Sequence, residues 1–516
     1  MKKITSFFVS LLCTLSIVFA QSSYIDTSFG VDGVSNYKIA EYLEADGPLN
    51  MDITDSGKIL KIGLASNEND ESLNIINQFN SNGALDLNFG NNGILELNDF
   101  IGYDIISKNN DIYISGTSTI NGNIGILKLD SAGNKVSSFG NNGVALIDKF
   151  ALGMTIKIDS NGKFIVAGRH INIDTEEEQL LMTRFNSNGT IDNAFGTNGA
   201  LQVNISDVVD NEELYDINLE LFDNNSLLVT GTVYTPENGT PTGEYEYNEF
   251  ALKANSNGVL DTSFGSNGFS IYYDLTARSA NIFDSYILSN NKILITIDGF
   301  DDSGFTGEPI QGLLRLNSDG SIDNTFGSNG LLTIYNENFY ILDLFDSNLD
   351  DDIFILGDGN DENNNWHILI LKVNENGIID NTFGENGILS LDFPDYDEIE
   401  YITNGEELAD GKILVSGFNN DNNGYILGRF FKENQLNVSD KALNTVALYP
   451  NPVRNEINIK STQAINHLQI YQMDGKLVYN QYLNTNLADV SLLKAGLYIV
   501  KAFSGNKVET FKINKL

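Results

Sequence analysis

A short phrase recurs seven times along this 516-residue chain, and it constrains the fold more than any other feature of the sequence. A Phe-Gly pair begins at Phe29, Phe89, Phe139, Phe195, Phe264, Phe326 and Phe383, at intervals of 50 to 69 residues. Three residues before the Phe stands an aspartate in six copies: Asp26, Asp86, Asp192, Asp261, Asp323 and Asp380. Val136 takes its place in the remaining copy, and a Gly preceded by Asn or Asp follows four residues after every Phe. A recurrence of this kind indicates a repeat architecture.

Each position of the phrase has a structural explanation. The Asn-Gly or Asp-Gly pair tolerates the positive φ that tight turns require. The aspartate can accept hydrogen bonds from backbone N–H groups just ahead of it. The Phe is apolar in every copy, so we expect it to be buried, which stabilises the fold by roughly 1.5–3 kcal/mol each. We therefore interpret these residues, such as Asp26, Phe29 and Gly30 or Asp86, Phe89 and Gly90, as a structural corner rather than as ligands or catalysts.

Between the corners the chain has the pattern of short β-strands. Each unit contains a run rich in Ile, Val and Leu that ends near a Gly, as in "GKILKIG" at 57–63 and "GKILVSG" at 411–417. With the shorter apolar stretches around it, this run predicts about four strands and no helix in each unit. Four short strands in roughly 50–70 residues are typical of a propeller blade. We predict an all-β fold with a seven-bladed β-propeller over residues 21–434, in seven units of about 60 residues.

The two ends of this region are incomplete in complementary ways. The last unit stops after "YILGRFFKEN" without a following Asp-x-x-Phe-Gly, and "YIDTSFGVDG" has no unit in front of it. Each end supplies the piece that the other lacks. We expect the two ends to pair, which leaves no open sheet edge.

The repeat resembles the delta-60 repeat, a family found in large bacterial surface proteins. The resemblance covers about residues 24–432, through "LDLNFGNNGI", "IDNAFGTNG", "LDTSFGSNG", "IDNTFGSNG" and "GKILVSG". It implies a propeller-like structure. The family has no established activity, so the resemblance implies no particular function.

The beginning of the chain has the pattern of an export signal. Lys2 and Lys3 precede an apolar run that ends at Ala20, and no stop-transfer segment follows. We predict a signal peptide over residues 1–20 and no transmembrane segment after its removal. The single cysteine, Cys13, lies inside this signal, so the mature chain has no thiol for a disulfide, a zinc–thiolate site or a nucleophile.

Negative charge is concentrated in the repeat. The whole chain has a net charge of −40, and residues 21–440 carry −47 because both ends are basic. Such a surface repels nucleic acids and anionic membranes, and it can attract cations or a basic protein partner. The solubility of an exported protein is an equally good explanation of the charge.

The composition changes after Asn434, where the repeat stops. We predict a linker over 435–445 and a small C-terminal β-sandwich over 446–516, because six or seven short strands alternate with turns there. This segment resembles the type A sorting domain of the bacterial type IX secretion system. The matching residues are Tyr449, Pro450, Asn451, Pro452, Asp474, Gly475, Gly496, Tyr498 and Lys515. The resemblance implies that the secretion machinery is a partner of residues 446–516 and that the protein is secreted or attached to the outer cell surface. A carbohydrate-binding sandwich is the alternative.

The sequence has no catalytic motif that we recognise. His170, His367 and His467 are far apart, and none belongs to a zinc-binding pair of histidines. No nucleophile elbow and no phosphate-binding Gly-rich loop is present. Carboxylates are so numerous that a glycosidase-like pair stays open.

The repeat varies most between its buried run and the next strand. Loops in the same place of every blade emerge on one face, so we expect them to form one crown, which is acidic and rich in Asn. The candidate ligand-binding residues of this crown are Tyr234, Tyr245, Tyr247, Phe305, Trp366, His367 and Tyr425. Aromatic rings beside Asp and Asn are suited to binding a polysaccharide. We expect no cofactor, but the Asp and Asn side chains could also bind calcium.

These observations predict a non-catalytic binding module on the cell surface or in the medium. Two alternatives belong to other classes of protein. A carbohydrate-active lyase or hydrolase would use carboxylates with raised pKa values in the propeller cleft. A structural surface-layer protein would self-associate and bind no small ligand.

Overall fold

The computed structural model describes most of the chain beyond its first 23 residues. The described residues are 24–38, 48–66, 72–171, 178–204, 213–236, 245–272, 284–300, 309–334, 340–346, 352–360, 366–384, 387–391, 401–419, 424–432, 446–461, 465–473, 475–483, 485–504 and 507–516. They form strands and turns, with no helix among them, which confirms the predicted all-β fold. The predicted signal peptide and linker lie outside the described residues. The chain divides into two compact units, residues 1–435 and 436–516.

The first unit is built mainly from four-stranded antiparallel sheets. In chain order the first is β2 to β5 (Pro48–Ile53, Ile59–Ser66, Ser72–Phe79 and Ile94–Leu97). Three more follow further along: β13 to β16 (Glu213–Leu221, Leu227–Pro236, Tyr245–Ala254 and Phe269–Tyr272), β17 to β20 (Ser285–Ile287, Ile293–Phe300, Pro309–Leu316 and Leu331–Thr333), and β21 to β24 (Tyr340–Asp346, Asp352–Asn360, Trp366–Asn374 and Ile388–Leu391). In each sheet the strands pair in the order of the chain.

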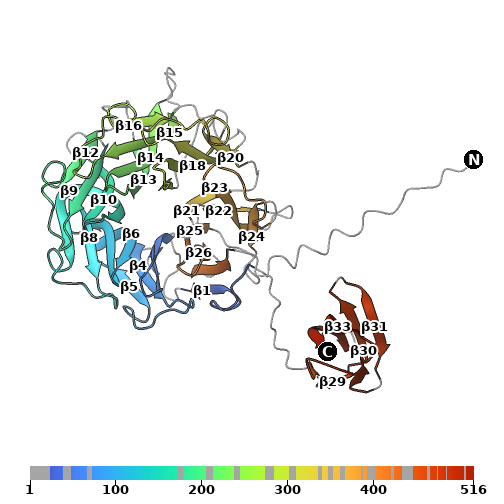
Figure 1. Cartoon of the computed structure of the whole chain (residues 1–516). Helices are drawn as coiled ribbons and strands as arrows, with labels where there is room; N and C mark the ends of the chain where they lie inside the picture. Colours follow the sequence, from blue (N-terminus) through green and yellow to red (C-terminus); the bar gives the residue numbers. More distant parts are fainter. Residues whose placement is uncertain are drawn as a thin grey trace, which may run out of the picture. The chain divides into compact units, whose positions relative to one another are not determined.

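One sheet has seven strands, because a single long strand is shared. It runs from β6 to β12 (Phe100–Lys108, Asp111–Ser118, Asn123–Leu129, Val144–Ile158, Phe164–Ile171, Glu178–Phe185 and Ala200–Asn204). The shared strand is β9, whose first half pairs with β8 up to Phe150 and whose second half pairs with β10 from Ala151. Figure 1 shows the sheets standing side by side in a ring, with β6, β13, β21 and β25 nearest its centre.

The last sheet joins the two ends of the unit. Its strands are β25 (Tyr401–Glu407), β26 (Lys412–Asn419), β27 (Gly424–Phe431) and β1 (Val34–Lys38). β1 pairs antiparallel with β27, from Val34 opposite Gly428 to Lys38 opposite Gly424. This is the pairing expected from the two incomplete ends, and it protects the backbone groups of both edges.

The recurring phrase forms the corner between the third and fourth strands of a sheet. At Asp323 one carboxylate oxygen accepts the N–H of Thr325 at 3.1 Å. The other lies 2.7 Å from Arg315 Nε and 2.6 Å from Lys292 Nζ. Arg315 in turn covers the ring of Phe326, 4.5 Å from its centroid, and Phe326 is fully buried. Comparable ion pairs join Asp26 to Arg429 and Lys412, Asp86 to Lys58, Asp192 to Arg184 and Lys163, Asp261 to Lys253, and Asp380 to Lys372.

Each corner also holds a turn of the next sheet. Gly265, in the corner of Phe264, donates its N–H to the carbonyl of Asp319 at 2.8 Å. The neighbouring Gly320 packs against the Phe264 ring so closely that a Cβ there would lie 2.8 Å from ring carbons. The repeated Phe-Gly pair therefore positions neighbouring sheets as well as turning the chain. At the closing sheet, the hydroxyl of Tyr24 takes over this role and accepts the N–H of Gly384 at 3.2 Å.

The second unit contains two sheets around one core. A three-stranded sheet has the order β28 (Val446–Tyr449), β29 (Glu456–Ser461), β32 (Leu487–Asp489). A four-stranded sheet has the order β31 (Leu477–Tyr482), β30 (His467–Gln472), β33 (Gly496–Ser504), β34 (Lys507–Lys515). Ile457 and Ile459 from the first sheet share a buried cluster with Leu468, Ile470 and Val500 from the second.

Candidate functional site

The innermost strand of every sheet of the first unit contributes to one central cavity of about 500 Å³. These strands are β2, β6, the second half of β9, β13, β17, β21 and β25, with Asp284 just before β17. Alternate side chains of a strand point to the same face, so each strand sends residues two apart toward the cavity. The cavity is therefore lined by two rings of side chains.

The first ring consists of one polar residue from each inner strand. Its members are Asn50, Asp104, Thr155, Asn218, Asp284, Asp343 and Asn404. They are equivalent by register, because each lies opposite the same position of the second strand, for example Asp104 opposite Ser115 and Asn404 opposite Ser416. In six of the strands a β-bulge immediately precedes the ring residue. A bulge re-aims the side chain that follows it, which here directs the ring residue to the cavity.

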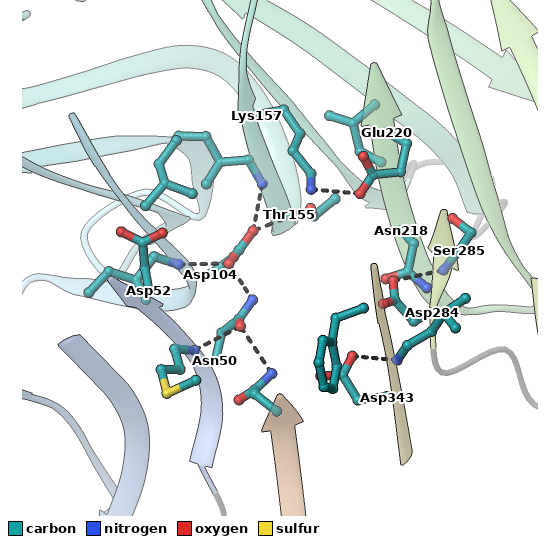
Figure 2. A pocket seen from close by; sticks show the side chains of 18 of the residues that line it. Asn50, Asp52, Asp104, Thr155, Lys157, Asn218, Glu220, Asp284, Ser285 and Asp343 are labelled. Carbon is teal, nitrogen blue, oxygen red and sulfur yellow. Dashed lines mark hydrogen bonds and ion pairs between the residues drawn. The ribbon is translucent and has the colours of Figure 1, made fainter. Parts of the chain in front are cut away.

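The second ring lies two residues further along each strand. It consists of Asp52, Ile106, Lys157, Glu220, Tyr286, Phe345 and Glu406. Figure 2 shows Asp52, Lys157 and Glu220 of this ring close to Asp104, Asn218, Asp284 and Asp343 of the first. The cavity thus combines amides, carboxyl groups, one ammonium group and aromatic rings.

Several carboxylates of the first ring bind neighbouring strands. Asp104 accepts the N–H of Ile105 in its own strand at 2.8 Å and that of Ile156 in β9 at 2.9 Å. Asp343 accepts the N–H of Leu344 at 2.9 Å and that of Gly405 in β25 at 2.6 Å. In both residues one carboxyl oxygen accepts a backbone N–H of the residue's own strand, and the other accepts a backbone N–H of the neighbouring inner strand.

Asparagines of the first ring continue these links. Asn50 donates its side-chain amide to Asp104, and Asn404 donates to Asn50 Oδ1 at 3.2 Å. Strands β21, β25, β2, β6 and β9 are consequently connected through ring side chains (Figure 2 shows the links around Asp104 and Asp343).

The second ring holds one ion pair and two carboxyl groups with raised pKa values. Lys157 Nζ lies 2.6 Å from Glu220. Burial lowers the pKa of Lys157, but Glu220, Asp104 and Asp284 outweigh this effect and raise it above its ordinary value. Burial raises the pKa of Asp52 to about 6. Burial, reinforced by the nearby Asp52 and Asp343, raises the pKa of Glu406 to about 8.

Asp284 and Asp343 form a carboxyl pair in the first ring. The two carboxyl groups are close enough for each to influence the pKa of the other. Burial raises the pKa of Asp343 to about 6, and burial together with Asp343 and Glu220 raises that of Asp284 well above its ordinary value. Two neighbouring carboxyls do not both ionise easily, so the pair releases its protons at a higher pH than isolated aspartates do.

A buried lysine stands behind the cavity wall. Lys61 in β3 is fully buried, and its ammonium group donates to Asn404 Oδ1 at 2.9 Å and to Thr403 and Ser416 at 3.0 and 2.8 Å. Burial lowers its pKa to about 7, against the attraction of Asp343. Lys61 therefore ties the first sheet to the closing sheet at the seam where the ring is completed.

The crown residues predicted from the sequence fall into separate sheets. Tyr234 and Tyr247 lie opposite each other at the end of β14 and β15, where Tyr245 lies opposite Pro236. Trp366 and His367 begin β23, opposite Asn360 and Gly359. Phe305 lies outside the described residues. Glu213, at the start of β13, lies opposite Tyr234. The inner strands therefore begin at the end of the propeller where the crown loops are. The first ring of cavity residues is consequently nearer to these loops than the second ring is.

Tyr425 does not belong to the crown surface. Its side chain is fully buried in β27, in a cluster with Ile75. It lies opposite Phe418, one position beyond the Gly that ends the buried run, and Ile124 and Ile368 occupy the same register in other sheets. The tyrosine fills a core position and is not available to a ligand at the crown.

Sequence reasoning placed the enzyme alternative in the propeller cleft but named none of the residues that line the cavity, although a signal for them exists. In four cases a lysine stands eight positions after the first-ring residue, at or just before the start of the strand that pairs with the inner strand. These lysines are Lys58, Lys163, Lys292 and Lys412. The described part of the chain contains no group of three or more His, Asp or Glu side chains arranged to hold a metal ion. The long crown loops at 172–177, 237–244 and 301–308, to which the calcium alternative applies, lie outside the described residues.

Among the residues that the structure describes, no helix has the length and apolar character needed to cross a membrane. Two family models match parts of the chain. Residues 447–515 match a secretion system C-terminal sorting domain, and residues 55–89 and 304–326 match a domain of unknown function described as a β-propeller. These matches confirm the predicted sorting domain and the predicted β-propeller character of the repeat. The protein carries a β-propeller repeat and a type IX sorting domain, and it is exported to the cell surface or into the medium.

Solved structures with a similar arrangement of strands are distant in sequence. The polysaccharide lyase Uly1 is 9% identical with a TM-score of 0.47, over 81% of this chain and 96% of the lyase. The β-propeller domain of the Trilobed protease from Pyrococcus furiosus is 9% identical with a TM-score of 0.40, over 78% and 98%. The endo-arabinase from Bacteroides thetaiotaomicron is 9% identical with a TM-score of 0.29, over 55% and 96%. A comparison with curated proteins finds no match.

Proposed function

We propose that this exported protein is a binding module without catalytic activity, displayed on the cell surface or released. Residues 1–20 would serve as its signal peptide and the C-terminal unit as a β-sandwich label for the secretion machinery. The propeller has seven blades in this proposal, because the first half of β9 completes one four-stranded blade and the second half begins the next. The ligand would bind at the central cavity and the loops around its mouth.

The observation that carries this proposal is the state of the cavity carboxyl groups. Asp104 and Asp343 use both oxygens as acceptors for backbone N–H groups of two strands, and Glu220 is paired with Lys157. Groups committed to the scaffold in this way are poor candidates for proton transfer to a substrate, which needs a carboxyl within reach of the reacting atom. A rigid ring of fixed polar groups is instead suited to recognition.

The lining favours a polysaccharide segment as the ligand. Asparagine amides and protonated carboxyls can both donate and accept hydrogen bonds, as sugar hydroxyl groups do. Tyr103, Tyr286 and Phe345 add aromatic rings to the same lining, which suit the apolar faces of sugar rings. A cavity with a few convergent polar groups among apolar ones is the usual form of a small-ligand site.

The test is a polysaccharide array probed with the mature protein, followed by analysis of the eluates for shortened glycans. We expect retention without shortened products. The Glu406→Gln and Asn218→Ala variants should weaken retention at least tenfold, whereas Asn290→Ala, at a hairpin on the opposite end of the ring, should leave it unchanged. Absence of binding to every glycan would overturn the assignment of a polysaccharide ligand.

A second candidate is a carbohydrate-active lyase or hydrolase. The observation that favours it is the Asp284–Asp343 pair, because neighbouring carboxyls with raised pKa values can act as acid and base. Shortened glycans in the eluates would replace the binding proposal with this one. In that case Asp284→Asn should abolish the shortening while leaving retention of the glycan within about threefold of the unmodified protein.

A further inference from the structure

The four-stranded sheet of the sorting domain has one apolar face toward the core and a second, mixed face that bears a group of aromatic side chains. One face supplies Leu468, Ile470 and Val500 to the core of the unit, where all three are fully buried. The opposite face, which we call the outer face, carries Tyr482, His467 and Phe503, because side chains alternate along a strand. Its tyrosine is 81% exposed. A sheet that has one solvated face normally carries polar residues there, so a group of aromatic side chains on that face indicates a binding surface.

The aromatic side chains of the outer face form a ladder across three strands. His467 lies directly opposite Tyr482 in β31 and Phe503 in β33. The His467 ring stacks on Tyr482 with centroids 4.4 Å apart and on Phe503 with centroids 4.8 Å apart. Stacking of this kind fixes the three rings in one row, the apolar platform of this face, before any partner binds, which reduces the conformational entropy lost on binding.

The outer face is also basic. Lys501 is exposed beside the ladder and lies over the Tyr471 ring, 5.6 Å from its centroid. Lys512 is exposed on the same face in β34, opposite Ile499. In the registers of the four strands, no described residue of this face is acidic: its other members are Gln469, Leu477, Asn480, Leu497, Ile499, Val508, Thr510 and Asn514. The face thus combines an apolar platform with positive charge.

Three motif residues of the sorting domain, Asn451, Tyr498 and Lys515, are engaged within the unit. The Asn451 side chain donates to the carbonyl of Lys512 at 2.9 Å and accepts the N–H of Asn514 at 2.8 Å. The Tyr498 hydroxyl donates to the Lys494 carbonyl at 2.8 Å, and the Tyr498 ring is buried. Lys515 is buried as well. Asn451, Tyr498 and Lys515 thus have a role within the fold, whereas Tyr449 is 51% exposed at the start of the motif.

We propose that the outer face, centred on Tyr482, His467 and Phe503, is the surface through which the sorting domain docks on a protein of the secretion machinery. The matching surface of that protein is apolar and bears carboxylates opposite Lys501 and Lys512. A second copy of this chain would place lysines against lysines, which charge repulsion disfavours. This inference rests on the sorting-domain assignment and is independent of the ligand of the propeller.

The first test measures export of the full chain in its own cells. In the variant Tyr482→Ser/Lys501→Glu, both altered side chains are exposed, so we expect the fold to survive. We expect the amount of protein outside the cell to fall at least tenfold and the protein to accumulate in the periplasm. The control Leu492→Ser/Lys460→Glu makes the same chemical changes at exposed positions off this face, and it should export within twofold of the unmodified protein. Unchanged export of the first variant would overturn the proposal.

Two further variants protect the test against an effect on folding. Tyr482→Phe keeps the platform and should export normally, whereas Lys501→Glu alone changes only the charge and should reduce export at least threefold. Normal export of Lys501→Glu would overturn the assigned charge complementarity.

A crosslinking experiment identifies the occupant. A photoreactive phenylalanine in place of Tyr482, introduced in the full chain and activated in living cells, should give an adduct with a component of the secretion machinery, identified by mass spectrometry. A homodimer, or an intramolecular adduct with residues 24–432, would overturn the proposed occupant.

Discussion

Two sets of carboxyl groups in the propeller have pKa values that are shifted in opposite directions. At the corners, burial raises the pKa of Asp323, but hydrogen bonds from Lys292 and Thr325 and the charge of Arg315 outweigh it and hold the pKa well below its ordinary value. At Asp380 the hydrogen bonds of Thr382 and Lys372 lower the pKa to about 2. In the cavity, burial raises the pKa of Asp52 to about 6 and that of Glu406 to about 8.

The difference separates the scaffold from the site. The corners have nearly the same sequence in each copy because each must provide the same turn and the same charge pairing. The ring residues occupy equivalent positions too, but they vary between Asp, Asn, Thr, Glu, Lys and aromatic residues. Buried carboxyl groups with raised pKa values destabilise the fold when they ionise, and such groups cluster at functional sites.

The largest difference between the two regions should appear on truncation of a corner aromatic. Phe326→Ala removes a fully buried ring that contacts Arg315 and packs against Gly377 of the next sheet. We expect the free energy of unfolding to fall by about 3–5 kcal/mol, the usual cost of a large cavity. Asn218→Ala in the first ring should change it by less than about 1 kcal/mol. Chemical denaturation of the exported protein measures both, and equal losses would contradict the division into scaffold and site.

A neutral amide should act in opposite directions at the two regions. Asp323→Asn leaves Arg315 and Lys292 without their carboxylate, and loss of one partner of a largely buried pair costs about 2–4 kcal/mol. Asp52→Asn removes a buried charge and should leave the free energy of unfolding unchanged or raise it by about 1 kcal/mol at pH 8. Denaturation of both variants at pH 8 decides the matter. A loss in both would mean that Asp52, like Asp323, supports the fold.

The all-β fold and the closure of the ring could be predicted because their signals are local and repeated. Turn glycines, a buried Phe and alternating apolar runs each indicate one turn or strand. Because the pattern occurs in seven copies, a departure in one copy does not change the prediction. The division inside the seven-stranded sheet could not be predicted in this way. Residues 144–158 pass from one sheet partner to the next as one continuous strand, with no turn signal to mark the boundary.

The residues that line the cavity could not be predicted for a different reason. Its ring residues are spread from Asn50 to Glu406, and only the closed ring brings them together. In the sequence each appears as a single polar residue in an apolar strand. Attention to aromatic residues also misplaced Tyr425, because an aromatic side chain near a loop can equally fill a core position, as it does in β27.

The pH dependence of stability should separate the two sets of carboxyl groups. Glu406 has a raised pKa in the folded protein, so the folded chain holds a proton between about pH 4.5 and 8 that the unfolded chain has released. Its contribution therefore makes stability fall as pH rises through this window. The corner aspartates have lowered pKa values, so their contribution is lost as pH falls below about 4.

Glu406→Gln tests the first half of this account. An amide cannot titrate, so we expect the loss of stability between pH 5 and 8.5 to shrink by about 1–3 kcal/mol relative to the unmodified protein. Denaturation curves at several pH values provide the measurement. An unchanged slope would show that Glu406 is ionised at neutral pH in the folded state. The loss below pH 4 should be the same in both proteins, because the corners are untouched.

The smallest effect is expected at the one corner that lacks an aspartate. Near Phe139 the corner position is Val136, and Lys128, which occupies the place of Arg315, pairs instead with Asp111 at 2.7 Å. The corner of Asp380 shows what an added carboxylate would do, because there one lysine, Lys372, lies 2.7 Å from Asp352 and 3.0 Å from Asp380.

Val136→Asp should reproduce this arrangement and raise the free energy of unfolding by about 0.5–1 kcal/mol at pH 7, the range of a partly exposed ion pair with an added backbone hydrogen bond. Val136→Asn is the matched control, because it can accept the backbone N–H but carries no charge. A gain confined to the aspartate, and lost in high salt, would assign the stabilisation of the corners to charge pairing. An equal gain from asparagine would assign it to the backbone hydrogen bond, and the lysines and arginines of the other corners would then act mainly as covers for the phenylalanine rings.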